Sequence, residues 1–136
     1  MKKNATRIIL AFSVACMGLT LMSLRPADEV ITKENGFTVI NTTLLAVDVE
    51  GYAGPTPLMI YIKGNKIEKI EALKNRETPK YFALIKRNLL TKWNGLVPKK
   101  AATQQVDAVT GATYSSEAVI ENVRRGLDYY NRKGKK

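Results

Sequence analysis

The sequence of 136 residues contains no histidine and a single cysteine, Cys16. A single cysteine excludes a disulfide within one chain, and it cannot supply the thiolates of an iron–sulfur cluster. The absence of histidine also excludes zinc sites of the His/Cys type and catalysis by Ser-His-Asp or Cys-His groups. If the protein performs redox chemistry, an organic cofactor must therefore supply it.

Long uncharged runs are also scarce, and the one that exists is residues 8–24, behind a short basic start. Its length lies between a signal-peptide core and a membrane span, which usually needs about 20 residues. No clean small-x-small cleavage site follows it, which favours an uncleaved anchor, with a cleaved signal as the alternative. Cys16 is interpreted as a small residue within this segment. The basic start predicts a cytoplasmic N-terminus, with the domain outside the cytoplasmic membrane, or in the periplasm after cleavage.

The charge is unbalanced, with 22 Lys and Arg against 12 Asp and Glu, a net charge of +10. A basic surface favours anionic partners such as phosphates, acidic proteins or lipid headgroups. The basic residues are dispersed along the chain, so we expect no nucleic-acid partner. The length suits one small domain. The predicted organisation is an anchor or signal peptide (1–24), a polar linker (25–36), a folded domain (37–131) and a solvated basic tail (132–136).

Residues rich in β-branched side chains predict the strands. Residues 37–49 are expected to form one strand, which Asn41-Thr42-Thr43 is able to interrupt. Residues 58–63 and 66–73 flank Gly64-Asn65 and predict a hairpin with a primed turn.

Helical spacing predicts two helices after these strands. In residues 81–93 the apolar side chains recur every three or four positions, and Tyr81 and Trp93 are expected in the core. The last helix is expected over residues 117–131, with Ser115 or Ser116 as its N-cap. Val106 is expected to begin a short strand before it. These elements predict an α+β fold, a small antiparallel sheet with two packed helices, preceded by an N-terminal membrane or signal helix.

The stretch ahead of the last helix, Asp-Ala-Val-Thr-Gly-Ala-Thr-Tyr-Ser-Ser (107–116), gathers small residues and hydroxyls where a loop enters a helix. Gly111 can adopt backbone angles that other residues avoid, and a glycine permits close approach of the chain to a ligand. A helix start offers free N–H groups and a positive dipole end, which suit a phosphate. Because the Gly-Ala-Thr core is short, the alternative interpretation is an ordinary turn followed by a helix cap, with no ligand.

The longer string Asp107-x-x-Thr110-Gly111-Ala112-Thr113 resembles the flavinylation signature Asp-x-x-Ser/Thr-Gly-Ala-Thr of the FMN-binding domain family. That family includes flavin-carrying subunits of sodium-pumping NADH:quinone oxidoreductases and of Rnf-type complexes. In the family the last Thr of the signature carries FMN through a phosphoester. The resemblance therefore implies FMN on Thr113.

Two further stretches match the family in order and spacing. Gly-Tyr-Ala-Gly-Pro (51–55) resembles its Gly-Tyr-x-Gly-Pro turn, and Glu77-Thr78-Pro79 resembles the start of its Glu-Thr-Pro-Gly-Leu-Gly segment. The resemblance covers about residues 37–130. Lys-Tyr-Phe (80–82) stands where the family often has Gly-Leu-Gly, near the flavin ring, so the packing of the ring is expected to differ here.

The resemblance implies a set of cofactor-binding candidates, several with a plainer alternative. Tyr52 either stacks on the isoalloxazine or closes a turn, and Thr78 either bonds the ring or caps the helix, with capping preferred. Asp107 either assists recognition by a transferase or pairs with a lysine. The complete set is Thr113, Asp107, Thr110, Gly111, Ala112, Ser115, Ser116, Tyr52, Gly54, Pro55 and Thr78; Gly54 and Pro55 are expected chiefly as turn-formers, and Thr110 bonds either locally or to the phosphate.

The function that the resemblance implies is an extracytoplasmic electron carrier with covalent FMN rather than a stand-alone enzyme. A separate flavin transferase would attach the flavin, and membrane redox proteins or a quinone-linked complex would exchange electrons with it. Two alternatives remain open: a non-covalent FMN-binding module or reductase, and an envelope binding protein that has lost its cofactor.

Overall fold

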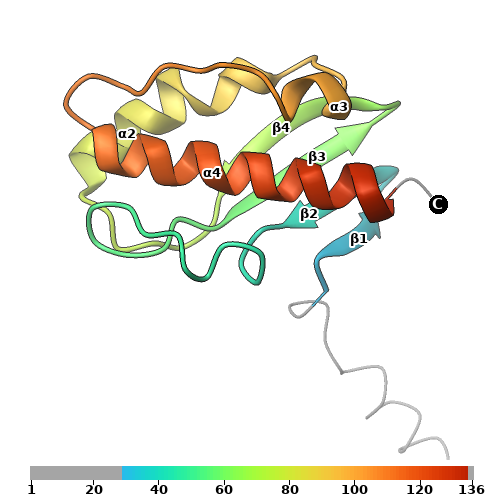
Figure 1. The fold of residues 1–136 in the computed structure, drawn as a ribbon, viewed down its shortest axis with the longest axis horizontal. Helices are drawn as coiled ribbons and strands as arrows, with labels where there is room; N and C mark the ends of the chain where they lie inside the picture. Colours follow the sequence, from blue (N-terminus) through green and yellow to red (C-terminus); the bar gives the residue numbers. More distant parts are fainter. Residues whose placement is uncertain (1–28, 135–136) are drawn as a thin grey trace, which may run out of the picture.

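The computed structural model describes residues 29–134, so the predictions made for residues 1–24 and their membrane or signal helix lie outside the described residues. The strands are β1 (Ile31–Glu34), β2 (Phe37–Asn41), β3 (Leu58–Lys63) and β4 (Lys66–Ala72). They form one antiparallel sheet in the order β1-β2-β3-β4 (Figure 1). The predicted α+β class is confirmed.

Both outer hairpins close through an asparagine and a glycine with positive φ angles. Gly64 and Asn65 each have φ of 58°, which confirms the primed turn predicted between β3 and β4. Asn35 (φ 49°) and Gly36 (φ 82°) make the corresponding turn between β1 and β2. Residues 31–34 were assigned to a linker, but this turn folds them back onto β2 as the edge strand of the sheet.

The strand predicted over residues 37–49 ends at Asn41, because local side-chain bonds turn the chain there. The Asn41 Oδ1 accepts hydrogen bonds from the Thr43 N–H (2.9 Å) and the Thr43 hydroxyl (2.6 Å). The N–H of Leu45 then bonds the Thr42 carbonyl at 3.0 Å. Residues 42–57 consequently form a long loop between β2 and β3, named here the 42–57 loop, and the expected interruption at Asn41-Thr42-Thr43 is confirmed.

The helical elements follow the sheet in sequence. The helix predicted over residues 81–93 is divided at Leu89 into an α-helix and a 3₁₀ turn, and a further short helix follows. Val106 lies in irregular chain rather than in a strand. The tail from Arg132 to Gly134 continues the last helix as a π-helical turn. The elements are α2 (Pro79–Asn88), η2 (Leu90–Trp93), α3 (Pro98–Ala101), α4 (Thr113–Tyr129) and η3 (Tyr130–Gly134).

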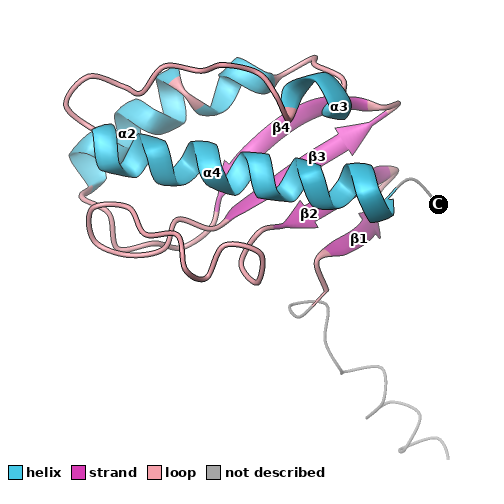
Figure 2. Cartoon of the chain, viewed as in Figure 1, coloured by secondary structure: helices cyan, strands magenta, loops and turns pink. Residues whose placement is uncertain are grey.

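The core lies between one face of the sheet and the helices, with α4 crossing the sheet (Figures 1 and 2). Gly126 permits this crossing, because a Cβ there would lie 2.9 Å from the Ile60 Cδ1 and 3.0 Å from the Thr42 Cγ2. Trp93 is buried in this core, as predicted. The side chains that share the core include Ile40, Leu58, Ile60, Phe82, Ile85, Leu89, Val119, Val123 and Leu127.

No helix in the part of the chain described here, residues 29–134, has both the length and the apolar character needed to cross a membrane.

Candidate functional site

At the start of α4, each residue of Gly-Ala-Thr has a separate physical role. Gly111 has φ of +86°, a conformation that side chains with a Cβ rarely adopt. Ala112 turns its methyl group into the core and is buried, so a small side chain is required there. Thr113 is the first residue of the helix and is exposed. The motif therefore delivers a solvent-accessible hydroxyl at a helix N-terminus.

The N-terminus of α4 carries no side-chain cap. The N-cap position is Ala112, which has no side-chain acceptor, so the prediction of Ser115 or Ser116 as the cap is wrong. The chain enters the helix directly after Gly111, which leaves both serines inside the first turn. Ser116 is fully buried and its Oγ accepts a hydrogen bond from the Val109 N–H at 3.0 Å. The serine thus holds the preceding loop in place and leaves the first N–H groups of the helix free for a ligand.

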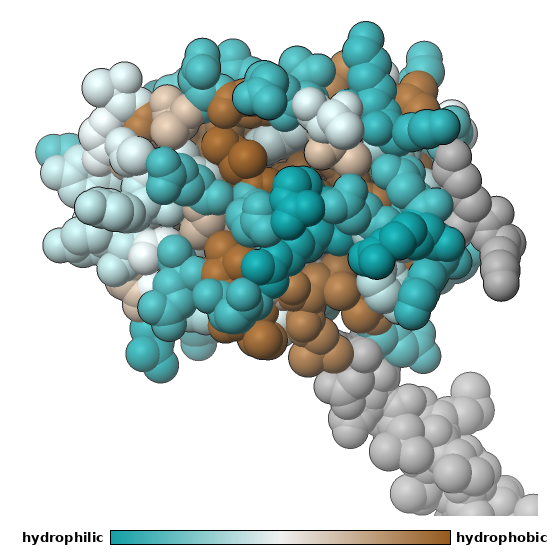
Figure 3. Space-filling model, viewed as in Figure 1, coloured by the Kyte–Doolittle hydropathy of each residue, from teal (hydrophilic) through white to brown (hydrophobic). Residues whose placement is uncertain are grey.

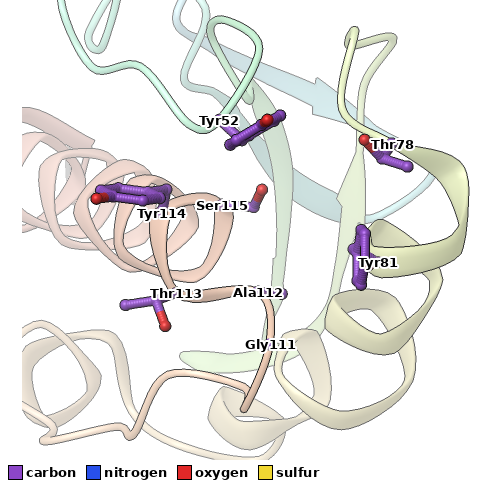
Figure 4. Close-up of a pocket in the computed structure, with 8 residues that line it drawn as sticks. All are labelled: Tyr52, Thr78, Tyr81, Gly111, Ala112, Thr113, Tyr114 and Ser115. Atoms are coloured by element: carbon purple, nitrogen blue, oxygen red, sulfur yellow. The ribbon is translucent and has the colours of Figure 1, made fainter.

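A hollow of about 330 Å³ opens beside this helix start. Three segments that are distant in the sequence form its walls: the tip of the 42–57 loop, the start of α2 and residues 111–115 (Figure 4). The volume falls in the range of small-molecule sites, about 300–1,000 Å³. The lining residues are Tyr52, Thr78, Tyr81, Gly111, Ala112, Thr113, Tyr114 and Ser115.

Three exposed tyrosines, one from each wall, surround the hollow (Figure 4). Tyr52 is 75% exposed, Tyr81 46% and Tyr114 68%. The expectation that Tyr81 lies in the core is wrong, because Phe82 and Ile85 face the sheet and Tyr81 falls beside their stripe, towards the hollow. Figure 3 shows the corresponding end of the molecule as pale, with neither strongly apolar nor strongly charged colour. Exposed aromatic rings beside a cavity are suited to stacking on a planar ligand.

The remaining sequence candidates occupy different places. Thr78 lines the hollow at the N-cap position of α2, but its side chain makes no cap hydrogen bond, so the preferred capping role is wrong. Asp107 and Thr110 are exposed in the part of the motif that forms the loop ahead of α4, and they do not line the hollow. Gly54 (φ +148°) and Pro55 lie in the turn of the 42–57 loop and border a different depression.

A buried polar network attaches the base of the 42–57 loop to α4. The Thr42 hydroxyl donates to the Asn122 Oδ1 at 2.6 Å and accepts the Leu58 N–H at 2.9 Å. The Asn122 Nδ2 donates to the Ala118 carbonyl at 2.9 Å and to the Thr56 Oγ1 at 3.4 Å. Asn122 is 1% exposed. The two walls of the hollow that come from the loop and from α4 are therefore joined through the core.

An ion-pair cluster joins the same two elements at the surface. Arg125 of α4 donates to both carboxylate oxygens of Asp48 (2.6 and 3.0 Å), to the Leu45 carbonyl (3.0 Å) and to Glu121 (2.9 Å). Hydrogen bonds from Arg124 and then from Arg125 lower the pKa of Glu121 to about 2, and the Arg125 guanidinium lowers the pKa of Asp48. The cluster fixes the loop on the helix without entering the hollow.

Sequence reasoning missed Tyr81, Tyr114 and Glu77. Tyr114 lies inside the motif string, and Glu77 belongs to the Glu-Thr-Pro match, so both had a local signal. The buried Glu77 carboxylate accepts hydrogen bonds from two N–H groups of the 42–57 loop, next to the hollow. Tyr81 is the middle residue of the Lys-Tyr-Phe that stands where the family often has Gly-Leu-Gly, and only the phase of α2 relative to the sheet reveals its direction.

The chemistry of the lining fits a planar aromatic ligand that carries a phosphate. None of the eight lining residues has a carboxylate, an amine or a guanidinium group. They offer aromatic faces, hydroxyls and the free N–H groups of α4, which suit a ring and a phosphate respectively. Within residues 29–134 there is also no cluster of three or more potential metal-ligating side chains.

Comparison with known proteins agrees with this geometry. The model of the FMN-binding domain family matches residues 51–128, more than half of the chain, and the match includes all three walls of the hollow. No match to the chain was found among curated proteins. The chain therefore belongs to the FMN-binding domain family, and its cofactor is FMN.

Proposed function

We propose that the protein is an extracytoplasmic electron carrier whose FMN is attached through a phosphoester to the hydroxyl of Thr113. One observation carries the proposal. The motif threonine is exposed at the uncapped N-terminus of a 17-residue helix, beside a hollow walled by three tyrosines. The motif hydroxyl, a helix N-terminus that can bind a phosphate, and aromatic side chains that can contact a ring therefore lie close together.

The chain's own residues would hold the cofactor in distinct ways. The first N–H groups of α4 would stabilise the phosphate oxygens, and the Ser115 hydroxyl, which points into the hollow in Figure 4, would add a further hydrogen bond. Tyr52 and Tyr81 would contact the ring from opposite walls. Gly111 keeps the backbone free of a side chain beside the phosphate.

Attachment requires a second protein, because the Thr113 hydroxyl is a weak nucleophile and no lining residue can act as a general base. We infer a flavin transferase that uses FAD as the donor. The new bond joins the Thr113 oxygen to the flavin phosphate, the pyrophosphate bond of FAD breaks, AMP leaves and the hydroxyl proton is released.

The bound flavin supplies reversible redox chemistry, which no other described group in the site can provide. The open hollow favours exchange of electrons with other proteins over conversion of an enclosed substrate. The basic and then apolar residues 1–24 support a location at the outer side of the cytoplasmic membrane, near membrane redox proteins or a quinone-linked complex.

Replacement of the motif hydroxyl tests the proposal. We expect the Thr113→Ala protein, co-expressed with a flavin transferase, to lose all flavin fluorescence on a denaturing gel, because no phosphoester can form. Thr103→Ala is the matched control, since Thr103 is an exposed threonine ahead of the motif and outside the hollow, and it should keep the fluorescent band. A fluorescent Thr113→Ala band, or a wild-type protein that releases all its flavin on denaturation, would contradict covalent attachment at this residue.

A further inference from the structure

The side chain of Glu77 holds the tip of the 42–57 loop with both of its oxygens. The Oε1 accepts the Tyr52 N–H and the Oε2 accepts the Ala53 N–H, each at 2.9 Å. Glu77 is only 5% exposed. Hydrogen bonds to a charged acceptor are stronger than those between neutral groups, and two of them fix the orientation of the loop as well as its position.

The loop leaves room for this carboxylate only because residue 51 is glycine. A Cβ on Gly51 would lie 1.7 Å from the Glu77 Oε1, closer than any non-bonded contact allows. On its own side Glu77 is held by Asn75, whose Oδ1 accepts the Glu77 N–H at 3.0 Å and whose Nδ2 donates to the Leu73 carbonyl at 3.1 Å. Gly51 on the loop and Asn75 beside Glu77 therefore both support this contact.

The carboxylate connects two walls of the hollow. Glu77 directly precedes Thr78 and the first turn of α2, which carries Tyr81, while its oxygens hold the backbone of Tyr52. We propose that Glu77 is a positioning residue of the flavin site, which sets the separation of the Tyr52 and Tyr81 walls and so the fit of the ring between them. This inference rests on the proposed function, because it takes the hollow as the seat of the flavin.

The geometry requires a carboxylate of this length. A glutamine would present an NH₂ group to one of the two N–H donors and leave that donor without its acceptor in a part-buried place. An aspartate lacks one methylene and would not reach both N–H groups. Glu77→Gln is therefore the smallest change that breaks the contact while keeping the volume of the side chain.

The first measurement tests the contact between Glu77 and the 42–57 loop in the absence of flavin. In the full-length cofactor-free protein, Glu77→Gln should speed hydrogen–deuterium exchange of the Tyr52 or Ala53 amide by at least about tenfold, the loss of one charge-assisted hydrogen bond. Glu71→Gln is the matched control, because Glu71 is exposed on β4, where it pairs with Lys69 at 2.9 Å. It should leave both amide rates at the wild-type value.

The second measurement tests the surroundings of the flavin ring through the emission of the flavin-loaded proteins. Tyrosine in contact with a flavin quenches its emission, so Tyr52→Ala should raise the emission per bound flavin. Since the Tyr52 side chain is largely exposed, this variant should fold as the wild type does. Glu77→Gln should raise the emission towards the Tyr52→Ala value, and Glu71→Gln should not change it.

The outcomes separate the two proposals. If the wild-type protein carries flavin, and Glu77→Gln leaves either the flavin emission or the exchange rates of both amides unchanged, the positioning role of Glu77 is overturned. The proposed function then still stands. A wild-type protein that takes up no flavin after expression with a transferase overturns both. If Glu77→Gln does not fold, an unchanged emission in Tyr52→Ala overturns the inference, and a raised emission supports the Tyr52 wall on which it depends.

Discussion

Single residues at this site serve separate needs, and the sequence reveals only some of them. Gly111 and Thr113 could be predicted, because a glycine before a helix and a hydroxyl after it form a local pattern. The true partner of Ser116, the Val109 N–H, could not be predicted, because it depends on the path by which the loop folds back over the helix. A serine near a helix start is usually a cap, and here the N-cap is Ala112, three residues before Ser115 and four before Ser116.

Asn122 gives the most direct test of the buried network that attaches the 42–57 loop to α4. Asn122→Ala removes the acceptor of the Thr42 hydroxyl and the donor to Thr56 while both threonines remain fully buried. We expect a loss of about 1–3 kcal/mol in the free energy of unfolding, measured by urea denaturation. Asn88→Ala, at an exposed position on α2, is the control and should change it by less than about 0.5 kcal/mol. Equal effects of the two changes would mean that the network contributes little.

At the scale of elements, the patterns that are local in sequence were predictable and those set by tertiary contacts were not. The β3–β4 hairpin followed from Gly64-Asn65, whereas β1 was missed although Asn35-Gly36 is a turn signal of the same kind. The strands beside that turn are short, and Lys33 and Glu34 made the segment look like a polar linker. The predicted 81–93 helix breaks at Leu89, and no proline or glycine is present there that would have predicted a helix end.

The packing of α4 on the sheet depends on Gly126, and this makes a prediction for the element as a whole. Gly126→Val places a branched side chain where even a Cβ would meet Ile60 and Thr42 at 3.0 Å or less. We expect the free energy of unfolding to fall by about 1–3 kcal/mol, because overpacking a buried contact outweighs the better helix propensity. In the control Ala83→Val, at an exposed position of α2, the loss should be about 0.5 kcal/mol. A thermal melt in which Gly126→Val matches or exceeds wild type would show that α4 does not lie this close to the sheet.

At the scale of the whole molecule, the hollow joins residues that no local pattern relates. Tyr52, Tyr81 and Tyr114 come from three segments separated by more than 25 residues each, and only the tertiary fold brings their side chains around one space. The sequence identified the family through its motifs, but it could not show that Tyr81 faces the hollow rather than the core.

The stability of the folded molecule should also depend on pH through the Glu121 cluster. The folded pKa of Glu121 is about 2, below its ordinary 4.5, so its contribution is complete above about pH 4.5 and is lost as the pH falls towards 2. Because Glu121 is about one-third exposed, we expect Glu121→Gln to lower the unfolding free energy at pH 6 by only about 1 kcal/mol.

The difference between Glu121→Gln and wild type should shrink as urea denaturation is repeated from pH 5 down to pH 2. It should also shrink in about 1 M salt, which screens exposed ion pairs. A difference that stays constant over this pH range would contradict the assignment of the low pKa to Glu121.

The site of attachment is tested most directly by the mass of the tryptic peptide that spans residues 101–124 from protein expressed with a flavin transferase. The geometry predicts that this peptide carries the mass of one FMN less one water, and that fragmentation places the addition on Thr113. The peptide also contains Thr110, Ser115 and Ser116, so the measurement discriminates between neighbouring hydroxyls. An unmodified peptide, or an addition on any hydroxyl other than that of Thr113, would contradict the account.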